Sequence, residues 1–137
     1  MKPILASNFM ERVFSQDSHH QSVSVIFTGQ NYFEAPGKSK TSVRQCNYNV
    51  LFDSVMDKSM LNTIGCRINP GQPSILNDAF AKLKKTFPTD KHRYLLIDGD
   101  PYSSMSDMPV RTHIFPDPVT GEIEPICFFG TKKSKRN

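Results

Sequence analysis

A short apolar run at residues 23–27, which ends in the polar residues Thr28, Gln30 and Asn31, most constrains the fold of this chain. Val23, Val25 and Phe27 alternate with Ser24, and Ile26 makes the other face apolar too. Such a pattern is typical of a strand covered on both faces, as in a parallel α/β sheet. Such sheets carry their chemistry at the carboxyl ends of the strands. The run therefore predicts a strand whose polar end positions a water or a phosphate, although amides and hydroxyls are neither strong acids nor strong bases.

The rest of the chain alternates apolar runs with segments of helical periodicity. Helices are expected at 3–16, from an N-cap at Asp57 to about Gly65, and at 74–87; strands are expected at 48–52, 93–98, 110–115 and 123–129. Apolar strands separated by helices indicate an α/β fold. The sequence thus predicts a mostly parallel sheet flanked by helices.

Length and composition narrow the class of protein further. The 137 residues suggest one domain, and the formal net charge of +4 comes partly from a basic tail at 132–136. Three scattered cysteines predict no disulfide framework, and no apolar run reaches the roughly 20 residues that span a bilayer. The amino terminus has no signal-peptide core. These features predict an intracellular protein without a membrane partner.

Two local motifs are candidate sites of chemistry. Gly37-Lys38-Ser39 matches the end of a phosphate-binding loop, but Tyr32 stands where the first glycine is required and Pro36 removes a backbone N–H donor. We reject that assignment in favour of a basic loop. The carboxylates of Asp98, Asp100 and Asp107 follow a predicted strand, a pattern that a metal-dependent nuclease or hydrolase also shows; a plain acidic loop is the simpler interpretation. No cysteine or histidine stands at zinc-site spacing, so no metal site is expected.

Residues 25–33, Val-Ile-Phe-Thr-Gly-Gln-Asn-Tyr-Phe, resemble the sensor strand of the FtsK/HerA-like ATPases that package viral DNA, including those of adenovirus-like and Polinton-type elements. The loop at 37–42, the strand at 48–52 and the late strands at 94–98 and 111–116 are similar to later parts of that family. The resemblance covers roughly residues 5–116.

The resemblance implies the C-terminal part of a P-loop ATPase core at 1–116, followed by an extension with a basic tail at 117–137. It implies a DNA translocase that acts as a homo-oligomeric ring on double-stranded DNA, with capsid proteins as further partners and location in the host nucleus, the cytoplasm or the virion. Gln30 would orient the attacking water and Asn31 would support it. Lys38, Lys40 and Arg44 would contact DNA phosphates or a neighbouring subunit's nucleotide.

The chain lacks the Walker A and Walker B motifs that hold ATP and Mg²⁺ in this family. ATP and Mg²⁺ are therefore expected only in a complete motor, and no cofactor or ATPase activity is expected for this chain alone. The alternative interpretation is a non-enzymatic basic module for DNA binding or oligomerisation.

Overall fold

The computed structural model describes residues 12–13, 24–29, 46–53, 58–105, 107 and 109–130. The chain divides into two units, Met1–Asn47 and Tyr48–Asn137. Few residues of the first unit are described. Among them, residues 24–29 form no helix or strand, and Ile26 is 93% exposed, so the prediction of a strand covered on both faces is wrong for this part. The helix predicted at 3–16 lies mostly outside the described residues.

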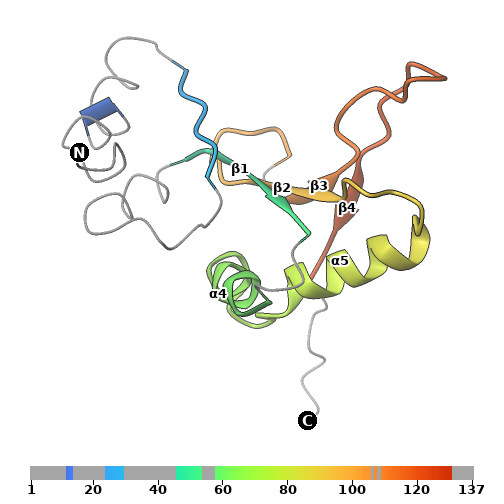
Figure 1. Cartoon of the computed structure of the whole chain (residues 1–137). Helices are drawn as coiled ribbons and strands as arrows, with labels where there is room; N and C mark the ends of the chain where they lie inside the picture. The colour runs from blue at the N-terminus through green and yellow to red at the C-terminus, as the bar shows by residue number, and fades with distance from the viewer. Residues whose placement is uncertain are drawn as a thin grey trace, which may run out of the picture. The chain divides into compact units, whose positions relative to one another are not determined.

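The second unit is built on a four-stranded sheet (Figure 1). Its strands are β1 (Tyr48–Phe52), β2 (Tyr94–Asp98), β3 (Val110–Thr112) and β4 (Ile126–Phe128), which lie side by side in that order. Every neighbouring pair is antiparallel. The predicted parallel P-loop sheet is therefore wrong.

The register of β1 and β2 explains why the two strands are antiparallel. Phe52, the last residue of β1, pairs with Tyr94, the first residue of β2. The connection between them thus starts and finishes at the same end of the sheet, whereas a parallel pair needs a crossover that returns the chain to the opposite end. The remaining strands follow one another without a helix between them, which also leaves them antiparallel.

Two helices, α4 (Lys58–Ile68) and α5 (Ile75–Thr86), make up that connection. Both lie on the same side of the sheet (Figure 1). α5 confirms the predicted periodicity, because its apolar side chains form one buried face: Ile75, Leu76, Ala79, Phe80 and Leu83. Asp78 in the first turn and Lys84 and Lys85 in the last turn suit the helix dipole.

Alternation along the strands gives the sheet two different faces. Leu51, Leu95 and Val110 share the face that the helices cover, and all three are buried. On the opposite face the cross-strand neighbours are Tyr48 with Asp98 and Val50 with Leu96. We call this second face the open face.

Several element boundaries differ from prediction. Gly65 does not end α4, which continues to Ile68. β3 stops at Thr112 because His113 has a φ of 54°, outside the β region. The strand expected at 123–129 is confined to Ile126–Phe128 and follows Pro125. The N-cap predicted at Asp57 lies outside the described residues. In the described part of the chain, no helix has the length and apolar character that crossing a membrane requires.

Candidate functional site

The structure does not describe the residues to which the sequence assigned a role in an ATP-driven motor. Gln30, Asn31, Lys38, Lys40 and Arg44 all lie outside the described residues, so their predicted roles stay predictions. The antiparallel sheet of the second unit is not the scaffold that those roles require. Within the second unit, the residues from β1 to the end of β4 carry no excess of lysine and arginine over aspartate and glutamate.

Asp98, which the nuclease interpretation treated as a metal ligand, is instead held by one cation, Arg111, and by two neutral hydrogen-bond donors. Its Oδ2 accepts hydrogen bonds from Arg111 Nη2 at 2.5 Å and from Ser103 Oγ at 2.7 Å, and its Oδ1 accepts one from Asp100 N–H at 3.1 Å. A guanidinium at this position repels a metal ion. Among the described residues, no three histidine, cysteine or acidic side chains gather as metal ligands. The carboxylate group is therefore structural.

This ion pair lies on the open face and is buried. The side chains of Asp98 and Arg111 are 1% and 9% exposed. Burial acts to raise the pKa of Asp98, but the hydrogen bonds from Ser103 and Asp100 and the charge of Arg111 outweigh it, so the pKa lies below its ordinary value. Through Ser103, the β2–β3 connection covers this end of the open face. Figure 1 shows that connection on the side of the sheet away from the helices.

On the β1 side of the open face, no described connection provides such cover. Tyr48, Val50 and Phe52 are 53%, 49% and 64% exposed and lie on one face of one strand; we call these three residues the β1 patch. Phe52 pairs across the sheet with Tyr94, whose ring lies 6.1 Å from that of Phe115, which is also exposed. A contiguous apolar surface of this kind on a folded protein is typical of an interaction site.

The backbone of the β1 patch pairs with no other strand among the described residues. Asp53 N–H donates to Arg93 O at 3.2 Å, which fixes residues 49, 51 and 53 as those whose backbone groups face β2. The backbone groups of Tyr48, Val50 and Phe52 therefore point to the other side. No described strand lies there, because β1 is at the edge of the sheet. The same three residues thus combine exposed apolar side chains with backbone groups that point away from β2.

The two edges of the sheet differ in how well they are protected against pairing. β4 is three residues long and is preceded by Glu124 and Pro125, a charge and a residue without an N–H. β1 has five residues, Tyr-Asn-Val-Leu-Phe, without charge, proline or glycine. Natural sheets use short strands, charges and prolines to block association at an edge. β1 lacks all three devices.

Tyr48 is anchored at its polar end. Its hydroxyl donates to Asp100 Oδ2 at 3.4 Å. Desolvation and the nearby carboxylates of Asp100 and Asp98 raise the pKa of Tyr48, which keeps the hydroxyl protonated as a donor. The ring is thus held on the open face with its apolar surface accessible.

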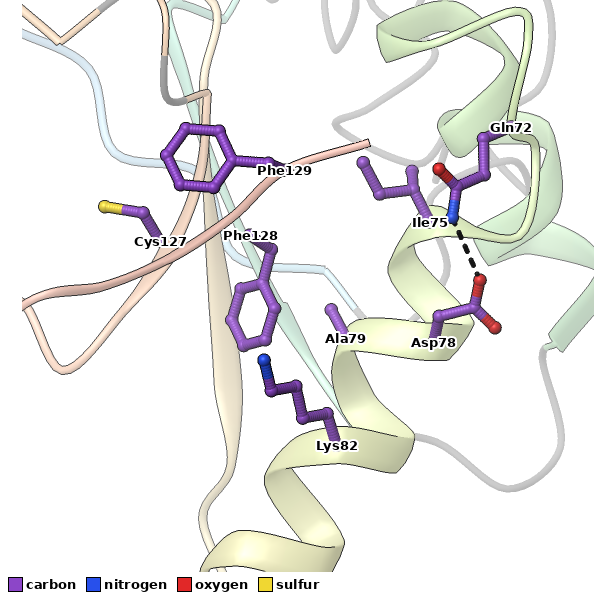
Figure 2. A pocket seen from close by; sticks show the side chains of 8 residues that line it. All are labelled: Gln72, Ile75, Asp78, Ala79, Lys82, Cys127, Phe128 and Phe129. Atoms are coloured by element: carbon purple, nitrogen blue, oxygen red, sulfur yellow. Dashed lines mark hydrogen bonds between the residues drawn. The ribbon is translucent and has the colours of Figure 1, made fainter. Parts of the chain in front are cut away.

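A second feature is a groove of about 430 Å³ between α5 and β4 (Figure 2). Ile75, Ala79 and Phe128 supply its apolar wall, and the Cys127 thiol points away from it. Gln72 Nε2 donates to Asp78 Oδ2 at 3.3 Å, and Ser74 Oγ donates to the same oxygen at 2.8 Å. These polar groups bond to each other, and the Lys82 amine that also lines the groove is a single charged group, not the set of convergent donors and acceptors typical of a small-molecule site.

Sequence reasoning missed the β1 patch because four of the five residues of β1 are apolar, and alternation alone did not show which face the helices cover. The detectable signal was the absence of any charge or proline within the strand.

Comparison with known proteins gives no assignment of function, so a functional assignment has to be argued from the structural features described above. No model of a known protein family matches the chain, and neither the curated proteins nor the solved structures contain a match.

Proposed function

We propose that the unit beginning at Tyr48 is a non-enzymatic protein-association module that accepts a partner strand at the edge and open face of β1. The observation that carries this proposal is the coincidence on Tyr48, Val50 and Phe52 of exposed apolar side chains and outward-pointing backbone groups. Strand addition uses both: backbone hydrogen bonds supply affinity, and side chains at alternate positions supply selectivity.

Other features support association in preference to the alternatives. The Asp98–Arg111 pair and the β2–β3 connection hold the central strands rigid beside the edge, so the surface is formed before a partner arrives. Electrostatic DNA binding would depend on the basic loop at 37–42 and the basic tail at 132–136, which lie outside the described residues, so that alternative stays a prediction. The packaging-ATPase interpretation required a parallel sheet, and we do not carry it forward.

A strand peptide tests the proposal. A labelled synthetic peptide with the sequence of residues 46–53, held at nanomolar concentration, is expected to bind the full-length chain with an affinity on the order of micromolar, as small interfaces do. Fluorescence anisotropy measures this binding. Val50→Lys in the full-length chain is expected to weaken it at least about tenfold, because an edge lysine opposes strand addition.

Val119→Lys is the matched control, since Val119 is 91% exposed in the β3–β4 connection and lies outside β1. It is expected to leave the peptide affinity unchanged. A scrambled peptide of the same composition is expected not to bind. Equal weakening by both lysine variants, or no binding of the β1 peptide, contradicts the proposed function.

A further inference from the structure

The geometry of the β1 patch indicates which strand it accepts, and the identity of that strand matters only if the proposed function holds. We infer that the strand which β1 accepts is β1 of a second copy of the chain, paired antiparallel about a two-fold axis at Val50.

The backbone of β1 is compatible with such symmetry. In an antiparallel ladder, residues whose groups point to the shared edge form the hydrogen-bonded pairs. An axis at Val50 places Val50 opposite its own copy and Tyr48 opposite Phe52 of the second copy. All of these residues have outward-facing backbone groups, as deduced from the bond between Asp53 and Arg93. About six interchain hydrogen bonds result from three such pairs.

The side chains are self-complementary in the same register. Because the open face of each copy continues into that of the other, both β1 patches merge into one apolar surface. Tyr48 and Phe52 meet as cross-strand aromatic pairs, which stabilise antiparallel strands, and Val50 packs against Val50. The pairing joins the two four-stranded sheets into one continuous sheet.

Charge does not oppose the contact. The five residues of β1 are uncharged, and Asp53 beyond its end lies 3.6 Å from Arg93 Nε, which balances it within its own copy. No like charges stand opposite each other in this register, so the cost that usually prevents self-pairing of edges is absent. The interface is small, and we expect a reversible dimer with a dissociation constant on the order of micromolar.

The register is tested with cysteine pairs in a variant whose Cys46, Cys66 and Cys127 are changed to serine. Facing residues of a hydrogen-bonded antiparallel pair have Cα atoms about 5.5 Å apart, within disulfide range. Val50→Cys is therefore expected to form a covalent dimer under mild oxidation. Phe52→Cys, which is more exposed than position 50 but lies opposite Tyr48 of the second copy, is expected to remain largely monomeric. Equal crosslinking of the two variants contradicts the axis at Val50.

Sedimentation velocity of the full-length chain from about 1 to 500 µM, a range that brackets a micromolar constant, tests the dimer itself. The wild type and Val119→Lys are expected to change from monomer to dimer, and Val50→Lys to stay monomeric. Wild-type protein that is monomeric throughout, or a dimer that survives Val50→Lys, overturns the inference.

The two proposals fail in different ways. A monomeric wild type that still binds the β1 peptide, with loss in Val50→Lys, rejects the dimer of the folded chain but keeps the association module. A wild type that neither dimerises nor binds the peptide rejects both. Thermal melts of each variant show whether it is folded, and concentration-dependent protection of the wild-type amides supplies a test that needs no substitution.

Discussion

Gly65→Ala is expected to lower the free energy of unfolding by about 3 kcal/mol, although alanine normally stabilises a helix relative to glycine. A Cβ at position 65 would lie 2.1 Å from the carbonyl oxygen of Pro73 and 3.5 Å from Ile75 Cγ2. The first contact is with backbone, in the turn that leads into α5, so it cannot be relieved by a rotamer change. α4 and that turn must separate, and α5 must shift with them.

Urea unfolding followed by circular dichroism measures this effect. Gly71→Ala is the matched control, because a Cβ there meets only Asn69 Oδ1 at 3.4 Å. We expect that variant to remain within about 0.5 kcal/mol of the wild type, as do most surface substitutions. A Gly65→Ala protein as stable as the control would show that α4 does not cross the turn before α5 as closely as described.

Arg111→Met is expected to cost about 3–4 kcal/mol, because it leaves the buried Asp98 carboxylate without its counter-charge. Asp98→Asn removes the charge; its amide oxygen can still accept from Asp100 N–H, and its NH₂ group can donate to Ser103 Oγ, because a hydroxyl also accepts. The double variant Asp98→Asn/Arg111→Met is therefore expected to be more stable than Arg111→Met alone. Urea unfolding of all four proteins gives the coupling free energy between the two positions. A coupling near zero contradicts the structural role of the pair.

The Asp98–Arg111 pair also makes the stability of the folded chain depend on pH in the acid range. Because the pKa of Asp98 is lower in the folded chain than its ordinary value near 3.8, its contribution is fully present above that value and is lost as pH falls through the folded pKa. Stability of the wild type is thus expected to fall as pH drops below about 4, and Asp98→Asn is expected to show a shallower fall. Equal slopes in the two proteins contradict the assignment.

Local features of the fold were predictable from the sequence. The apolar periodicity of α5 located its buried face, and the run at 94–98 located β2. The direction of the strands was not predictable in the same way. It depends on the connection between β1 and β2, which contains two helices and returns the chain to the end of the sheet that it left. An apolar run does not reveal the direction of its neighbour.

The contacts of the candidate site also could not be predicted from the sequence, because they join residues that are far apart in the chain. Asp98 looked like a free acid at the end of a strand, because its partner Arg111 is 13 residues away and becomes adjacent only when β3 pairs with β2. The β1 patch likewise depends on which face the helices cover. Its apolar side chains were visible in the sequence, but their exposure follows from the position of α4 and α5 on the other side of the sheet.

Amide hydrogen exchange along β1, measured by NMR from dilute to concentrated solution, tests the central claim most directly. Asn49 and Leu51, whose N–H groups face β2, are expected to exchange slowly at every concentration. Tyr48, Val50 and Phe52 are expected to exchange quickly in dilute solution and to become protected as concentration rises. Uniform protection of all five amides in dilute solution would contradict the account, because it would show that the outer edge of β1 is already paired within one chain.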